Sequence, residues 1–89
     1  MNQIQTALPK VDEQYEAILR QHMPVAEDFK FQDDTELGKV GLDSLTAVDV
    51  MLSLEDTFEI VFPDSMLTYE VFRHYASLRD AVQTLVDEG

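Results

Sequence analysis

The chain has 89 residues, of which 45% are apolar, and carries a formal net charge of −12. This length predicts one small domain with a single core of modest stability. Because the chain contains no cysteine, a disulfide scaffold and a thiolate metal site are excluded. The N-terminus lacks the basic-then-apolar pattern of a signal peptide, and no apolar run approaches the roughly 20 residues that span a bilayer. We therefore expect a cytoplasmic protein.

The acidic residues dominate the middle of the chain, where no Lys or Arg occurs between Lys39 and Arg73. The acidic residues in this interval are Asp43, Asp49, Glu55, Asp56, Glu59, Asp64 and Glu70. A surface of one sign attracts basic partners and repels nucleic acid and anionic membranes. We therefore expect neither nucleic-acid nor membrane binding and interpret the interval as a docking surface. A solvated face that only improves solubility is the alternative.

A first helix is predicted to begin at Pro9 and to end before Pro24. Proline suits the first helical position because it has no amide to leave unpaired. Apolar residues then recur at helical spacing, at Val11, Tyr15, Ile18 and Leu19.

A long connection follows, over roughly residues 25–43. Its spaced apolar residues are Phe29, Phe31, Leu37, Val40 and Leu42. A loop of this length in a compact domain is usually functional or packed down by its own side chains, and these residues favour the packed form. Gly38 and Gly41 are expected to allow tight turns at its end.

The second helix is predicted over about residues 44–58, where no Gly or Pro interrupts the chain. Ser44 is expected to be its N-cap, with the side-chain oxygen accepting a hydrogen bond from a free amide of the first turn. In that position the serine lies at the surface.

This helix is apolar on two faces. One stripe, assigned to the core, contains Ala47, Val50, Met51, Leu54 and Phe58, and the other contains Leu45, Val48 and Leu52 with Asp49 and Asp56 beside it. Such a helix is either deeply buried or uses its second face for a partner. Because so small a domain cannot surround it, we expect the second stripe to be an exposed recognition surface. The alternative is that the long connection covers it.

The remaining segments are shorter. Residues 59–64 are expected to be an irregular link whose apolar residues fill the core, with a strand as the less favoured alternative. Thr68 is predicted to cap a short helix from Tyr69 to about His74 that turns Val71 and Phe72 inward. Ser77 is expected to cap the last helix, with Asp80 three residues later as in a capping box. The inner stripe of that helix is Leu78, Val82, Leu85 and Val86.

The segment Gly41-Leu42-Asp43-Ser44-Leu45, followed by an uninterrupted helix, resembles the attachment site of acyl and peptidyl carrier proteins. The order of segments over about residues 11–86 is similar to the layout of that family, as are Phe58-x-Ile60, the proline three residues later and Leu67-Thr68. The resemblance implies an all-α fold, a four-helix bundle of acyl-carrier-protein type with a long loop between helices 1 and 2 and a short third helix. We expect one carrier domain over residues 1–89, with an ordered core at about residues 9–87.

The resemblance also implies a function without catalysis. A 4′-phosphopantetheine arm would be attached to Ser44, beside Asp43, and would hold acyl or aminoacyl intermediates as thioesters. The residues implied to contact partner enzymes are Leu45, Val48, Asp49, Leu52 and Asp56. The implied partners are a phosphopantetheinyl transferase, a loading acyltransferase or adenylating enzyme, and a downstream synthase or transferase. The carrier itself is expected to be a monomer.

The subtype of carrier is predicted from a few residues at which this chain differs from primary fatty-acid carriers. Thr46 and Ala47 replace an acidic-polar pair common in primary fatty-acid carriers. Phe62-Pro63 and Leu67-Thr68 look more like discrete carriers of polyketide, nonribosomal-peptide or other antibiotic-type pathways. Two alternatives stay open: a primary fatty-acid carrier, and an unmodified acidic helical adaptor that binds a basic partner, with Ser44 only a cap.

The chain's own chemistry is expected to be slight. A serine hydroxyl is a weak nucleophile unless a base activates it. Asp43 is expected to be solvated and would therefore be a poor general base. His22 and His74 lie far from Ser44 in the sequence. An EF-hand loop starting at Asp33 would lack essential oxygen ligands. We therefore predict no catalytic and no metal-binding residues.

Overall fold

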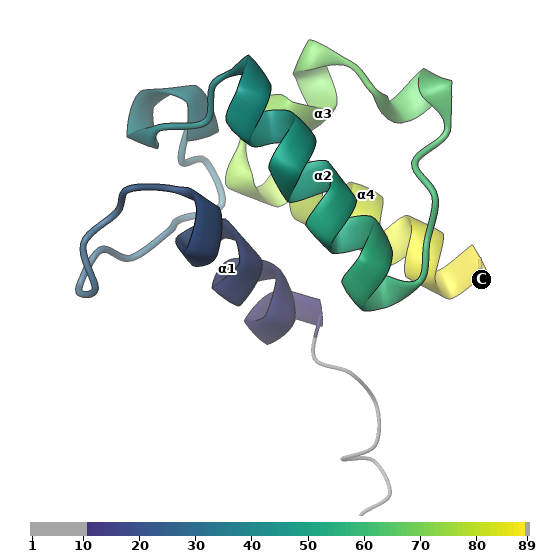
Figure 1. Cartoon of the computed structure of the whole chain (residues 1–89), viewed down its shortest axis with the longest axis horizontal. Coiled ribbons are helices and arrows are strands. Elements are labelled where there is room, and N and C mark those ends of the chain that lie inside the picture. Colours follow the sequence, from purple (N-terminus) through teal and green to yellow (C-terminus); the bar gives the residue numbers. More distant parts are fainter. Residues whose placement is uncertain (1–10, 89) are drawn as a thin grey trace, which may run out of the picture.

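The computed structural model describes residues 11–88, which are mainly helical (Figure 1). Its α-helices are α1 (Val11–His22), α2 (Ser44–Phe58), α3 (Tyr69–Arg73) and α4 (Tyr75–Glu88), with short 3₁₀ turns η2 (Leu37–Val40) and η3 (Asp64–Met66). The described residues form no strand, only an isolated bridge between Glu36 and His74. The predicted all-α fold, with a long first loop and a short third helix, is confirmed. The predicted helix start at Pro9 lies outside the described residues.

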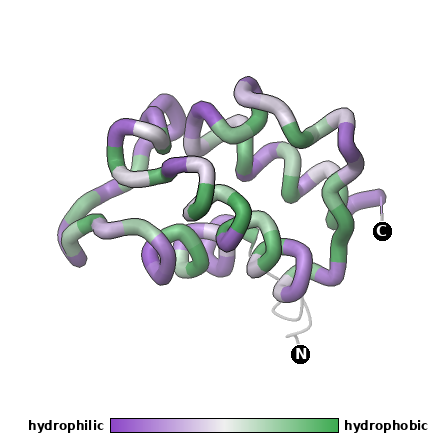
Figure 2. The backbone as a smooth tube through the Cα atoms, turned by 45° about the horizontal axis from the view of Figure 1, so that its top comes forward, coloured by the Kyte–Doolittle hydropathy of each residue, from purple (hydrophilic) through white to green (hydrophobic). Residues whose placement is uncertain are grey.

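The helices enclose one core. α1 packs against α2 and α4, and α3 packs against α4. Hydrophobic and hydrophilic stretches alternate along the helices, as Figure 2 shows. The buried apolar side chains are Val11, Tyr15, Ile18, Leu19, Met23, Leu37, Val50, Leu54, Ile60, Phe62, Tyr75, Leu78, Ala81 and Val82. The inward stripes predicted for the first and last helices are therefore correct, with Leu85 and Val86 half-buried against this core.

The long loop between α1 and α2 is packed down, as predicted. Leu37 is fully buried, and Phe31, Val40 and Leu42 pack against the core. Phe29 meets Phe31 edge-on, with ring centroids 5.0 Å apart.

Arg20, near the end of α1, holds the first part of this loop. Its guanidinium donates hydrogen bonds to the carbonyl oxygens of Ala26, at 3.1 Å, and Phe29. It also forms an ion pair of 2.8 Å with Glu16. Backbone carbonyls in a loop need partners, so this one side chain fixes the chain where it leaves the helix.

Tyr75, the first residue of α4, joins three segments of the fold. The Tyr15 hydroxyl of α1 donates to the Tyr75 carbonyl at 2.7 Å. The Tyr75 amide donates to the Thr35 carbonyl of the loop at 2.9 Å. The ring of Phe31 stacks on the Tyr75 ring with centroids 4.9 Å apart. Burial raises the pKa of Tyr15, so its phenol keeps the proton that it donates.

The predicted start of the last helix at Ser77 is wrong. α4 begins at Tyr75, so that only His74 separates it from α3, which ends one residue before the predicted His74. Ser77 lies within the first turn and reaches back along the chain. Its Oγ accepts from the His74 amide at 3.1 Å and donates to the Val71 or His74 carbonyl. The serine thus stabilises the junction between the helices rather than capping α4.

The link after α2 fills the core only in part. Glu59, in the left-handed conformation, ends α2. Ile60 and Phe62 are buried, but Val61 between them is 76% exposed. The Phe62 amide donates to the Glu55 carboxylate at 2.8 Å. The prediction of core-filling residues is therefore right for Ile60 and Phe62 and wrong for Val61, which faces away from the core.

The two loop glycines differ, which gives a matched pair of substitutions. Gly41 has φ +115°, and a Cβ there would lie 2.5 Å from Pro24 Cδ, whereas a Cβ at Gly38 would have no heavy atom within 4 Å other than those of its own chain neighbours. Gly41 therefore adopts a backbone conformation that favours glycine, whereas the conformation of Gly38 does not require it. We expect Gly41→Ala to lower the free energy of unfolding by about 1–3 kcal/mol and Gly38→Ala to change it by less than about 1 kcal/mol. Urea denaturation measures both, and equal effects would contradict this assignment.

Candidate functional site

The N-terminus of α2 is built differently from the prediction. The N-cap is Asp43, whose Oδ1 accepts from the Thr46 amide at 2.8 Å. Ser44 is the first residue of the helix and is exposed. Aspartate and serine are both good caps, and here the carboxylate one residue earlier takes the free amide. The Ser44 hydroxyl forms no hydrogen bond with residues 11–88 and is available to another molecule.

The Asp43 carboxylate is ionised at neutral pH. The hydrogen bond from the Thr46 amide holds the pKa of Asp43 below its usual value. A carboxylate held in this way accepts protons poorly. Asp43 therefore organises the helix start and is not suited to activate the neighbouring serine.

The second apolar stripe of α2 is exposed, as predicted. Leu45, Val48 and Leu52 are 79%, 50% and 53% exposed, and Asp49 and Asp56 beside them are exposed too. The long connection does not cover this face. On the opposite side Val50 and Leu54 are buried, with Met51 and Phe58 packed against the core. Ala47, predicted to lie in the core, is instead half-buried at the surface.

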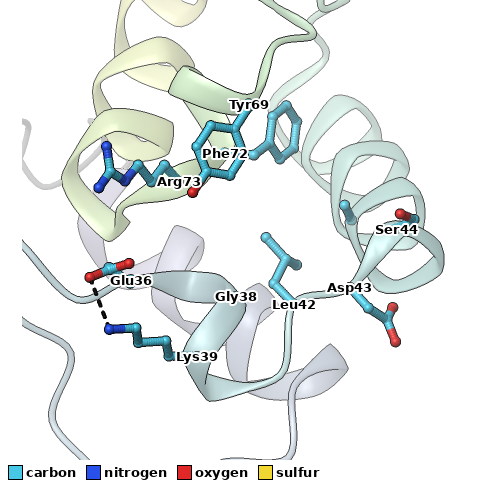
Figure 3. A pocket seen from close by; sticks show the side chains of 10 residues that line it. Glu36, Gly38, Lys39, Leu42, Asp43, Ser44, Tyr69, Phe72 and Arg73 are labelled. Atoms are coloured by element: carbon cyan, nitrogen blue, oxygen red, sulfur yellow. Dashed lines mark ion pairs between the residues drawn. The ribbon is translucent and has the colours of Figure 1, made fainter.

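Two cavities open beside Ser44. The larger, of about 570 Å³, lies between the start of α2, η2 and α3, and is drawn in Figure 3. The smaller, of about 370 Å³, lies between α2 and the segment that leads into α3. Ser44, Ala47 and Phe72 line both of them. From the sequence, Phe72 was expected only to face inward, because the cavity wall that it forms depends on how α3 packs beside η2.

The larger cavity has apolar walls and charged residues around them. Leu42, Ala47 and Phe72 provide apolar surface. Glu36 and Lys39, at the edge of the cavity, form an ion pair of 3.4 Å that Figure 3 marks with a dashed line. Tyr69 and Arg73 contribute from α3. No sequence pattern associates these α3 residues with Ser44.

The two histidines lie elsewhere. His22 Nε2 is 2.9 Å from Ser53 Oγ, between α1 and α2, and His74 joins α3 to α4. Neither lines the two cavities at Ser44. Among residues 11–88 no group of three or more His, Cys, Asp or Glu side chains is placed to hold a metal ion. No helix within the same range is long and apolar enough to cross a bilayer.

The chain belongs to the family described as "Phosphopantetheine attachment site", which matches residues 17–85. It is a carrier protein and not an enzyme, and its cofactor is 4′-phosphopantetheine bound covalently to a serine. The resemblance inferred from the sequence is thereby confirmed at the level of the family.

Among known proteins, the chain is 34% identical over 55 residues to the aminoacyl carrier protein of Agrobacterium fabrum. This match covers 62% of the chain and 66% of the relative, just under two thirds of the relative's length. The first of the two similar structures that follow holds a carrier protein in complex with an enzyme.

The first structure is an engineered Bradyrhizobium japonicum glycine:[carrier protein] ligase complexed with ATP and a carrier protein from Agrobacterium tumefaciens. The match has a TM-score of 0.73 and 29% identity and covers 83% of this chain and 97% of the matched chain. The second is the Bradyrhizobium japonicum ligase complexed with glycylated carrier protein. Here the TM-score is 0.71 and the identity 23%, with 82% and 99% of the two chains covered, so this match supports the fold alone.

The residues at the start of α2 fit the cofactor. An exposed hydroxyl begins a helix of 15 residues, and a helix N-terminus favours a phosphate group through its free amides and positive dipole end. The adjoining cavity provides apolar and polar surface for the rest of such a group.

Substitutions at positions 43 and 44 test which of the two residues caps the N-terminus of α2. We expect Asp43→Ala to lower Tm, because a first-turn amide loses its acceptor, and Ser44→Ala to leave Tm nearly unchanged.

Asp43→Asn keeps a capping oxygen without the charge. Because folding depresses the pKa of Asp43, its charge stabilises the fold above the unfolded-state pKa of about 3.9 and stops doing so as pH falls through the lower folded-state value.

The Tm advantage of the wild type over Asp43→Asn should therefore be present at pH 7 and shrink below about pH 4. Thermal unfolding followed by circular dichroism across pH measures this difference. A larger loss for Ser44→Ala than for Asp43→Ala would show that the cap is misassigned.

Proposed function

We propose that Ser44 is the serine to which the phosphopantetheine arm is attached. The sequence contains four serines, Ser44, Ser53, Ser65 and Ser77. The hydroxyls of Ser53 and Ser77 are engaged with other residues, and Ser65 lies in the three-residue turn η3. Ser44 combines an exposed hydroxyl with the start of a long helix. This combination is the observation that carries the proposal.

The attachment would be made by a separate phosphopantetheinyl transferase with coenzyme A as donor. Ser44 Oγ forms a bond to the phosphorus next to pantetheine, and the bond from that phosphorus to the adenosine side of the pyrophosphate breaks. The transferase supplies the base that takes the hydroxyl proton, because Asp43 is held by the Thr46 amide. The amides at the start of α2 stabilise the new phosphate ester.

The cargo that we propose is an aminoacyl group, with an acyl group as the second possibility. The arm ends in a thiol that can hold either as a thioester. The A. fabrum relative is named an aminoacyl carrier protein, and the carrier complex with 29% identity contains a glycine ligase. Both favour an amino acid and an adenylating loading enzyme. Intact mass of the protein from its host would reveal the cargo.

The pathway is a further part of the proposal. We assign delivery to a downstream synthase or transferase of nonribosomal-peptide or polyketide type rather than to primary fatty-acid synthesis, on the residues at Thr46, Ala47 and Phe62-Pro63. We also propose that residues 1–89 form one monomeric carrier domain, since α1, α2, α3 and α4 share one core. Use of coenzyme A is compatible with the expected cytoplasmic location.

The docking surface that we propose is the exposed stripe Leu45, Val48 and Leu52 with Asp49 and Asp56. Apolar side chains without a partner on one helix face mark an interaction surface. The interval between Lys39 and Arg73 has no basic residue to offset the acidic ones. A partner enzyme should therefore present apolar residues surrounded by basic ones.

Modification of Ser44 tests the main proposal. Incubation with coenzyme A and a broad-specificity phosphopantetheinyl transferase should add the mass of one phosphopantetheine to the wild type. Ser44→Ala should gain nothing, and Ser65→Ala, which removes another exposed serine, should be modified like the wild type. No mass gain on folded wild-type protein would contradict the proposal and favour the acidic adaptor.

Charge reversal tests the docking surface. We expect Asp49→Lys together with Asp56→Lys to lower kcat/KM for modification by the transferase about tenfold or more, because electrostatic steering of the basic partner is lost. Glu13→Lys together with Asp87→Lys makes the same change in net charge on exposed positions of α1 and α4. If both double variants react alike, the effect comes from net charge and the docking assignment is wrong.

A further inference from the structure

Arg73, the last residue of α3, carries a donor and a charge that the chain itself does not use. Its Nε is the only buried side-chain nitrogen or oxygen within residues 11–88 that has no hydrogen-bond partner. Buried polar groups are nearly always paired, so a single exception calls for an explanation. No carboxylate in the described part of the chain forms an ion pair with Arg73, although the sequence has 18 acidic and only 6 basic residues.

The carboxylates beside Arg73 in the larger cavity have other partners. Glu36 and Asp43 both line this cavity. Glu36 forms its ion pair with Lys39 at 3.4 Å, and Asp43 accepts the Thr46 amide at 2.8 Å. The fold thus engages its own acids elsewhere and leaves the Arg73 guanidinium for an acceptor from another molecule.

The chemistry of the guanidinium indicates which acceptor fits. Nε–H and one Nη–H of an arginine point in parallel from the same edge of the planar group, and the two oxygens of a carboxylate match this pair. A hydroxyl or an amide carbonyl offers one acceptor atom and no negative charge. A carboxylate therefore satisfies both the orphaned Nε and the uncompensated charge of Arg73.

The way to Arg73 leads through the cavity beside Ser44, where the two residues stand on opposite sides in Figure 3. The guanidinium lies 5.8 Å from the centre of the Tyr69 ring. Tyr69 is 72% exposed, so its ring can turn aside without disturbing the core and admit a side chain to Nε. Tyrosine and arginine are also enriched among the residues that dominate binding energy in protein interfaces.

We propose that Arg73 binds an Asp or Glu side chain of a partner enzyme, through Nε and one Nη, when that enzyme meets the carrier at Ser44. The use of this contact in transfer rests on the proposed attachment at Ser44, whereas the binding of a carboxylate to Arg73 does not. The partner then presents an acidic residue for Arg73 and basic residues for Asp49 and Asp56. Contacts of opposite sign at separate places fix the register of the two proteins, so the enzyme approaches Ser44 in one orientation.

A protein side chain suits this site better than a free carboxylic acid. Leu42, Ala47 and Phe72 provide apolar walls around Arg73, and the neighbours of an acidic residue in its own chain can pack against them. Ser44 and Ala47 of α2 line the same cavity, so the site is continuous with the helix that carries the proposed docking surface. One partner can therefore contact both.

NMR of the intact apo protein tests the binding of a carboxylate. The probe is the peptide acetyl-Leu-Glu-Leu-amide, and acetyl-Leu-Gln-Leu-amide, which has the same shape without the charge, is its control at equal ionic strength. The Glu peptide should shift the Nε–H resonance of Arg73 saturably, and the Gln peptide should not. The Nε groups of Arg20 and Arg79 serve as internal controls, because carboxylates of the chain already lie beside them.

Two variants separate the paired donors from the charge. Arg73→Lys keeps a positive charge but has no planar pair of donors, so it should weaken binding of the Glu peptide by about tenfold. Lys39→Met removes another cation from the same cavity and should leave the affinity nearly unchanged. Circular dichroism confirms that both variants are folded.

Equal responses to the two peptides, or no response at Arg73, contradict the proposal, and so does an undiminished affinity in Arg73→Lys. Free propionate that binds Arg73 as tightly as the Glu peptide would make the ligand a small carboxylic acid and overturn the assignment to a partner. Modification with coenzyme A and transferase is measured in parallel. No mass gain overturns the attachment at Ser44 and the use of the contact in transfer, whereas a mass gain without a response at Arg73 overturns this inference alone.

Discussion

The contacts of Tyr75 are the constraint on which the arrangement of this domain depends. One residue accepts a hydrogen bond from Tyr15 of α1, donates one to Thr35 of the loop and stacks on Phe31. A loop of this length would otherwise have many conformations, and ordering it costs entropy. Because Tyr75 fixes the loop close to its last turn, η2 and Gly41 deliver the chain to the start of α2 in one position. The geometry around Ser44 therefore depends on contacts that Tyr75 of α4 makes with α1 and with the loop.

The same packing leaves one face of α2 without a partner. α1 contacts α2, while α3 lies mainly against α4, so the other three helices do not surround this fifteen-residue helix, which is apolar on two sides. Exposed Leu45, Val48 and Leu52 would favour self-association by themselves. The acidic residues beside them oppose contact between like-charged copies, and in the proposed docking role they would favour partners of the opposite charge. Stability of the core and availability of the surface thus come from one helix with two apolar stripes.

The sequence predicted what depends on local pattern. The 3.6-residue period located α1, α2 and α4, and the Leu45 stripe was correctly expected to be exposed. The errors concern choices between neighbours of similar propensity. Asp43 and Ser44 are both good caps, and Ser77 is a good cap that instead bonds to the chain before it. The wall formed by Phe72 and Arg73 could not be predicted, because it depends on how α3 packs beside η2, and no periodicity encodes that contact.

The misassigned cap has a consequence for the proposed attachment. If Ser44 capped α2, its oxygen would have to accept an amide hydrogen bond and carry a phosphate ester as well, so that the helix start would change with modification. With Asp43 as the cap, the Thr46 amide keeps the same partner whether or not Ser44 bears a group. The serine oxygen is then free to point toward a partner enzyme. Separating the capping carboxylate from the proposed attachment hydroxyl by one residue would let the fold stay constant when Ser44 is modified.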